Sequence, residues 1–276
     1  MNIKIVADSS SNLFHMDGID YESVPLKLVT DEREFVDDEN LDCAAMMEYL
    51  DSYKGRSGSS CPTVGEWLEA FGDSQYVFTL AISKSMSGSH NSALQAKAAY
   101  EEEHPDRKVC CLDTLTTGPE MIMISEEIRR LAEQGLSFEE IAAGAEKYME
   151  KTHMAFMLSS VDNLAKNGRV SMLIAKAVGF LNIRIVGKAS DEGTFQQEHK
   201  SRGEKKGVAS LYSLLKENGF AGGKVRINHV FNEGAAEALK NLILEEYPDT
   251  DVAVTPTTGL CSFYAEQGGV IVGFEG

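Results

Sequence analysis

Residues 76–102 read YVFTLAISKSMSGSHNSALQAKAAYEE. The apolar run 76–82 predicts a buried strand, and the alanine-rich stretch 90–102 predicts a helix. The loop that joins them, residues 83–89, contains four serines. One serine is enough to cap a helix, so this loop has more hydroxyl groups than helix formation requires.

The first half of the chain repeats this alternation of strand and helix. Strands are predicted at 3–7 and 108–113, one further extended segment at 22–29, and helices at 42–53, 64–71, 118–135 and 137–150. Strands that alternate with crossover helices predict a parallel sheet covered on both faces. In such α/β sheets, ligands bind at the carboxyl ends of the strands. The polar clusters of this sequence fall at those positions.

The second half has a different pattern, which predicts an α+β arrangement. Strands are expected at 154–158, 224–231, 251–255 and 269–274, helices at 161–167, 171–180 and 234–246, and a hairpin with an Asp/Gly turn at 183–195. We therefore expect two domains, an α/β domain over residues 1–154 and an α+β domain over residues 155–276.

The composition excludes several classes of protein. The net charge is -17, with 43 acidic and 26 basic residues, which argues against binding to nucleic acid phosphates. No apolar run has the length of a membrane span, and the first residues lack a signal-peptide pattern. We therefore expect a cytoplasmic protein without membrane insertion. The five cysteines have no CxxC spacing, so neither a disulfide framework nor a metal site is expected, and no cofactor is implied.

Three predicted helix starts are rich in hydroxyl groups: residues 59–63, 85–89 and 114–119. A helix start holds anions through its unpaired backbone N–H groups and its positive dipole end, and hydroxyls there add donors. Each cluster alone is also typical of plain capping. The segment Ser87-Gly88-Ser89 differs because its glycine allows a ligand to approach the backbone closely. A parallel sheet would bring all three clusters to one edge.

A nucleophilic serine is an alternative interpretation of the same loop. The segment Met86-Ser87-Gly88 lacks the first glycine of the G-x-S-x-G motif, and the sequence does not show whether a histidine reaches a serine. His90 is expected to be solvated or to cap the helix. Asp8 and Asp113, each at the end of a strand, are expected to orient the serine loops by accepting hydrogen bonds.

Several stretches together resemble the DegV family of bacterial fatty-acid-binding proteins. The opening Val6-Ala7-Asp8-Ser9-Ser10 is similar to that family's first strand and turn, and Leu112-Asp113-Thr114 to a second such turn. The other matches are 59–63 to the motif T-S-Q-P-S, 82–89 to I-S-S-x-L-S-G-T, 164–171 to L-x-K-x-G-R-I-S, and 202–206 to R-x-x-K-K. These matches occur in order from residue 3 towards the carboxyl end.

The resemblance implies a protein that binds a long-chain fatty acid between two domains and does not itself catalyse a reaction. It places the carboxylate on the hydroxyls of Ser59 and Ser87. The predicted ligand-binding residues are Ser59, Ser60, Thr63, Ser87, Gly88, Ser89, Arg169 and Cys261. In some family members a fatty acid kinase phosphorylates the bound acid. Cys261 stands where the family has a head-group histidine, so this departure weakens the case for the kinase partner and leaves fatty acid binding in place.

An acyl chain needs apolar surface near the junction of the two halves. The candidates are Met154, Phe156, Met157, Met172, Leu173, Ile174, Val178, Phe180 and Leu181, all of which are equally suited to an ordinary core. Arg202, with Lys200, Lys205 and Lys206, is either a docking patch or a solvated charge run. Two alternatives stay open: a serine hydrolase acting on an anionic ester or phosphate, and a binding protein for a short anionic ligand.

Overall fold

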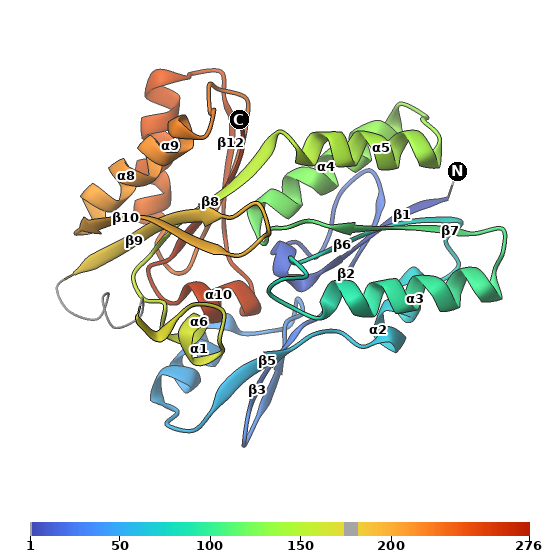
Figure 1. The fold of residues 1–276 in the computed structure, drawn as a ribbon, viewed down its shortest axis with the longest axis horizontal. Helices are drawn as coiled ribbons and strands as arrows, with labels where there is room; N and C mark the ends of the chain where they lie inside the picture. The colour runs from blue at the N-terminus through green and yellow to red at the C-terminus, as the bar shows by residue number, and fades with distance from the viewer. Residues whose placement is uncertain (1, 174–181) are drawn as a thin grey trace.

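The computed structural model describes residues 2–173 and 182–276, which include three sheets (Figure 1). The first sheet has the order β2-β1-β6-β7 and is parallel throughout. Its strands are β1 (Ile3–Asp8), β2 (Asp20–Val24), β6 (Tyr76–Ala81) and β7 (Lys108–Asp113). The prediction of a parallel sheet is confirmed, and the ends of β1, β6 and β7 meet at one edge.

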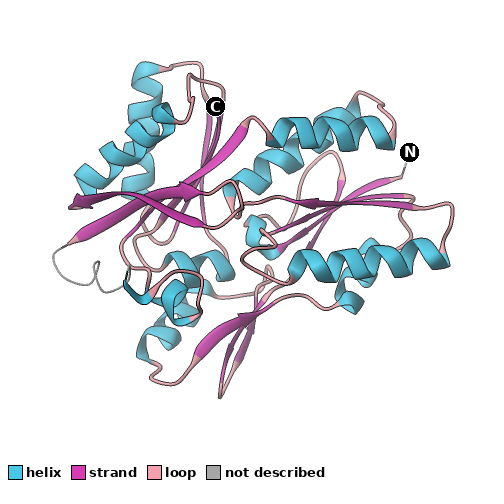
Figure 2. Ribbon diagram, in the orientation of Figure 1, coloured by secondary structure: helices cyan, strands magenta, loops and turns pink. Residues whose placement is uncertain are grey.

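Helices cover both faces of this sheet, as Figure 2 shows. They are α2 (Val64–Phe71), α3 (Ser89–Glu103), α4 (Pro119–Glu133) and α5 (Phe138–Met149). Val77 packs with residues of α2 and α3, whereas its neighbour Phe78 packs with residues of α4 and α5. Side chains alternate between the two faces of a strand, so the continuous apolar run 76–82 supplies two cores at once.

The second sheet is mixed and has the order β10-β9-β8-β13-β11-β12. Its strands are β8 (Thr152–Leu158), β9 (Ile183–Ala189), β10 (Phe195–Arg202), β11 (Lys224–His229), β12 (Asp251–Pro256) and β13 (Val270–Glu275). One face packs on α8 (Glu204–Glu217) and α9 (Glu233–Glu246). The other face contacts α6 (Asp162–Lys166) and α10 (Gly259–Ala265) and is directed towards the first half of the chain.

A third, small sheet lies beside α10. It has the order β4-β3-β5, with β3 (Lys27–Thr30), β4 (Glu34–Val36) and β5 (Ser57–Ser60), and it packs with α1 (Cys43–Ser52). The short helix η1 (Ser9–Ser11) follows β1. The small sheet brings Ser59 next to α10, because β5 pairs with β3 at Leu28.

The structure corrects parts of the sequence interpretation. The single extended segment predicted over 22–29 is wrong, because the chain forms two strands on either side of Pro25, in different sheets. Ser59 and Ser60 belong to a strand and not to a helix start, and helices α8 and α10 were not predicted. The helix predicted at 171–180 falls mostly outside the described residues. The division at residue 154 falls inside β8, and the domain boundary stays a prediction.

Candidate functional site

The serine loop after β6 is held by two aspartates at the ends of neighbouring strands. Asp8 is fully buried, and its carboxylate accepts hydrogen bonds from Ser89 Oγ at 2.6 Å and from the Ile82 N–H at 3.0 Å. Asp113 accepts from the Lys84 N–H at 3.0 Å. Burial raises the pKa of Asp8, and the hydrogen bonds oppose that shift. The orienting role predicted for both aspartates is confirmed.

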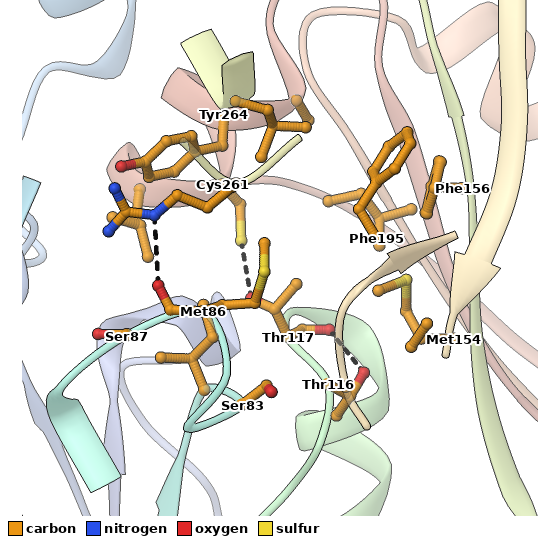
Figure 3. Close-up of a pocket in the computed structure, with 18 of the residues that line it drawn as sticks. Ser83, Met86, Ser87, Thr116, Thr117, Met154, Phe156, Phe195, Cys261 and Tyr264 are labelled. Atoms are coloured by element: carbon orange, nitrogen blue, oxygen red, sulfur yellow. Dashed lines mark hydrogen bonds between the residues drawn. The ribbon is translucent and has the colours of Figure 1, made fainter. Parts of the chain in front are cut away.

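A cavity that is partly open to solvent lies between the parallel sheet and the second sheet (Figure 3). Its walls come from both halves of the chain and are mainly apolar. They include Leu26, Ile82, Met86, Leu115, Met154, Phe156, Leu158, Leu164, Phe195, Leu260, Ala265 and Ile271. An elongated apolar molecule with a small polar end fits such a wall.

Polar groups gather at one end of the cavity. Ser59 Oγ lies 2.8 Å from the hydroxyl oxygen of Tyr264, across the two halves of the chain. The Arg169 guanidinium lies 5.7 Å from the centre of the Tyr264 ring and donates from Nε to the Met86 carbonyl at 3.3 Å. Ser87 follows Met86, and its hydroxyl oxygen accepts from the Ser89 N–H at 3.2 Å. These residues form one continuous polar rim.

The other end of the cavity is aromatic and apolar. Phe156 and Phe195 stack with their ring centres 4.7 Å apart. Figure 3 shows both rings, together with Met154, on the opposite side of the view from Ser87 and the Tyr264 hydroxyl. The cavity therefore has a cluster of hydroxyls and a guanidinium at one end and stacked aromatic rings at the other, and the hydroxyls of Ser83, Thr116 and Thr194 also line its wall.

Helix α10 supplies Cys261 and Tyr264 and is fixed by a buried carboxylate. Asp37 accepts from the Gly259 N–H at 2.6 Å and the Leu260 N–H at 2.9 Å, so it satisfies the start of the helix. Burial raises the pKa of Asp37 to about 6. Cys261 donates from its thiol to the Ser10 carbonyl at 3.4 Å, and burial raises its pKa to about 12. Cys261 is therefore a neutral thiol at ordinary pH.

Of the eight predicted ligand-binding residues, the cavity wall includes Ser59, Ser87, Arg169 and Cys261. The other four lie outside it. Thr63 caps α2 in a capping box with Glu66, and Ser60 is exposed at the end of β5. Ser89 is bonded to Asp8, and Gly88 is exposed beside the Cys61 sulfur.

The apolar residues predicted to surround the acyl chain also fall partly inside and partly outside the cavity wall. Met154 and Phe156 line the cavity, whereas Met157 points to the opposite face of β8 and packs with α8 and α9. Met172 and Leu173 are exposed. Ile174, Val178, Phe180 and Leu181 lie outside the described residues. Arg202 and its neighbouring lysines are exposed at the end of β10 and the start of α8, and their docking role stays a prediction.

The cavity residues that the sequence analysis did not select include Tyr264 and Phe195. Neither has a local signal, because each reaches the site through long-range packing. Thr116 and Thr117 also line the wall, and they belong to the hydroxyl cluster at 114–119. Thr117 Oγ1 lies 3.6 Å from the Cys261 sulfur.

The surroundings of the serines bear on the hydrolase alternative. Within residues 2–173 and 182–276, no histidine makes a hydrogen bond with Ser87. The expectation that His90 is solvated or caps a helix is wrong, because the side chain is buried and Nδ1 has no partner in the described chain. In that same part of the chain, no group of His, Cys, Asp or Glu side chains is arranged to hold a metal ion, and no helix is long and apolar enough to cross a membrane.

Comparisons with known proteins cover nearly the whole chain. The sequence model of the family described as "Uncharacterised protein, DegV family" matches residues 2–275. A DegV domain-containing protein from Streptococcus pneumoniae is 43% identical over 279 residues, covering 100% of this chain and 99% of that protein.

Two solved structures have nearly the same fold. One is a DegV family protein from Eubacterium eligens loaded with heptadecanoic acid, with 44% identity, a TM-score of 0.97 and 99% of both chains covered. The other is the Streptococcus pneumoniae Fatty Acid Kinase (Fak) B3 protein loaded with linoleic acid, with 43% identity and a TM-score of 0.98. It covers 100% of this chain and 99% of that one.

Proposed function

The chain belongs to the DegV family, and we propose that it binds one long-chain fatty acid in the cavity between its two halves. The observation that carries this proposal is the polarity of the cavity, with hydroxyls and a guanidinium at one end and stacked aromatic rings at the other. The relatives from Eubacterium eligens and Streptococcus pneumoniae, crystallised with heptadecanoic and linoleic acid, support the ligand class.

The carboxylate lies at the polar rim, where Ser59 and Ser87 donate hydrogen bonds to it. Ser87 is suited to this role because its oxygen already accepts from the Ser89 N–H, which leaves its proton free to point into the cavity. Arg169 contributes positive charge, and no carboxylate in the described part of the chain forms a salt bridge with it. Hydrogen bonds to an ionised group are the stronger kind, which favours the carboxylate over a neutral head group.

The acyl chain lies along the apolar wall towards Phe156 and Phe195. Burying about sixteen carbons at roughly 0.8 kcal/mol per CH2 contributes on the order of 12 kcal/mol, before the cost of fixing a flexible chain is subtracted. A net gain of about half that amount corresponds to micromolar or tighter binding once the head-group contacts are added. The protein would then retain its lipid through purification.

We propose that the protein is a carrier that holds the fatty acid without catalysing a reaction. We also propose that it acts in the cytoplasm. The relative described as a Fatty Acid Kinase B3 protein suggests that a kinase acts on the bound acid. In that step a carboxylate oxygen attacks the γ-phosphorus of ATP, giving an acyl phosphate and ADP. The neutral thiol of Cys261 stands where the family has a histidine, so this chain has no ionisable imidazole at that position of the head-group network.

Mass spectrometry of an organic extract tests the proposal. Protein purified without lipid treatment is compared by native intact mass before and after extraction. We expect one fatty acid per chain in the extract and a matching mass difference. An extract without fatty acid, together with an intact mass equal to the sequence mass and no uptake of added palmitate, would refute the proposal.

A further inference from the structure

The proposed fatty acid cavity adjoins a second cavity, which is also partly open to solvent. The second cavity lies between the end of α5, the loop after β7, and strands β8 and β9. Three residues line both cavities: Leu115, Met154 and Ala189. These side chains therefore form the partition between the two spaces.

Strand β8 borders both cavities, and the second cavity reaches both faces of its first half, because His153 and Ala155 also line it. Thr152 lines the second cavity, Met154 lines both, and Phe156 and Leu158 line the first. Every second residue of a strand faces the same side, so these four side chains form one continuous row. At about 3.3 Å per residue the row is roughly 20 Å long. Met154 stands at the position in this row where the first cavity meets the second.

The two cavities differ in the groups that line them. Next to the partition, the first cavity presents the stacked rings of Phe156 and Phe195. The second presents the Glu120 carboxylate, which accepts from Thr152 Oγ1 at 2.8 Å, and Lys188, which donates to Asn218 Oδ1 at 2.7 Å. Lys188 is partly exposed, so a hydrocarbon chain in the second cavity would remove water from its ammonium group, which is unfavourable.

We infer that Met154 is a specificity-determining residue that sets the length of the acyl chain this protein binds. The inference rests on the proposed function. The chain extends from the polar rim along β8 and ends against Met154, with Leu115 and Ala189 completing the partition. Each added methylene gains apolar contact until the methyl end reaches Met154. A longer chain must displace the Met154 side chain and enter the polar cavity.

The test measures the affinity of saturated fatty acids of about 12 to 20 carbons by displacement of a fluorescent fatty acid. For the unaltered protein, the affinity rises about fourfold for each added methylene and then stops rising. Met154→Ala removes the Cγ, Sδ and Cε atoms from the partition. In this variant we expect the rise to continue for about two or three further carbons.

Leu115→Gly gives a second way to open the partition. Leu115 has a φ of 54°, a conformation that glycine adopts without strain, so the substitution removes the side chain and is compatible with the backbone. It should extend the accepted chain length in the same direction as Met154→Ala. Circular dichroism spectra of both variants check that the fold is retained.

Two methionines serve as matched controls. Met86→Ala shortens a wall residue near the polar rim and should lower the affinity for all chain lengths by a similar factor. Met157→Ala shortens a residue of the same strand that faces the opposite core and should leave the length profile unchanged. If the unaltered protein binds fatty acids but the profiles of Met154→Ala and Leu115→Gly match its own, the inference is wrong and the proposed function stands. If no fatty acid of any length binds, the proposed function itself fails.

Discussion

Replacing Ser87 by alanine should weaken fatty acid binding and leave the fold intact. The hydroxyl lies on the cavity wall, and within the described residues its oxygen accepts only the Ser89 N–H, at 3.2 Å. Loss of a hydrogen bond to a charged group costs about 1.5–3 kcal/mol. That loss corresponds to roughly a 10- to 150-fold increase in the dissociation constant. The lost acceptor for the Ser89 N–H should lower the free energy of unfolding by only about 1 kcal/mol.

The assay measures displacement of a fluorescent fatty acid by palmitate and, separately, by the alcohol of the same length. The alcohol has no carboxylate, so its affinity should fall by less than about threefold in Ser87→Ala. Ser60→Ala is the matched control, because Ser60 is exposed in β5 and does not line the cavity. Equal palmitate affinities for Ser87→Ala and the unaltered protein would remove Ser87 from the head-group site. Equal losses for the acid and the alcohol would show that Ser87 does not bind the carboxylate.

Three further predictions concern stability and reactivity. Burial raises the pKa of Glu120 from 4.5 to about 7, so the folded state holds its proton more tightly and folding stability falls as the pH rises through that window. Urea unfolding at several pH values should show that Glu120→Gln removes roughly 3 kcal/mol of this pH-dependent loss in the free energy of unfolding. Identical pH profiles for the variant and the unaltered protein would show that Glu120 does not cause the loss. Gly193→Ala places a Cβ 2.8 Å from the Leu115 Cα at a φ of 70°, whereas at Gly135, with a φ of 72°, an added Cβ meets no atom of residues 2–173 and 182–276 within 4 Å. The first variant should lose about 2 kcal/mol more free energy of unfolding than the second, and equal losses would show that the hairpin tip is not tightly packed. The buried, neutral thiol of Cys261 should react with iodoacetamide more slowly than the four partly exposed cysteines, as peptide mass mapping would show, and equal rates would mean that α10 opens readily.

The parallel sheet could be predicted because its signal is local. In β6, Val77 and Phe78 are both apolar and face opposite cores, which produces the continuous apolar run of a sheet covered on both sides. The serine loop and the two aspartates that hold it follow from the same pattern, because polar residues gather where parallel strands end. The fatty acid cavity is built on that edge.

The position of Ser59 could not be derived in this way. The short polar segment 57–60 has no apolar pattern, and it forms β5 only because it pairs with β3, about thirty residues earlier in the chain. That pairing, and not a helix start, brings Ser59 to Tyr264. Local sequence periodicity does not predict contacts between segments this far apart in the chain.

The apolar wall was only partly predictable for a related reason. Met154 and Met157 are equally suited to a lipid cavity by residue type, but they differ by an odd number of positions in one strand and so face opposite sides. The alternation of side chains along a strand shows that the two methionines face opposite sides. Only the packing of the sheet shows which of the two sides borders the cavity. Phe195 lies on β10, two strands from Phe156 on β8, and the two rings meet across β9, where Gly187 has no side chain beside Phe156.

A crystal structure of the protein with palmitate tests the central claim most directly. The account predicts continuous electron density for one acyl chain in the cavity between the two sheets. Its carboxylate should lie within hydrogen-bond distance of Ser59 Oγ and Ser87 Oγ, and its methyl end against Met154. Density with the carboxylate at the Phe156 and Phe195 end, or no acyl density in this cavity under saturating palmitate, would contradict it.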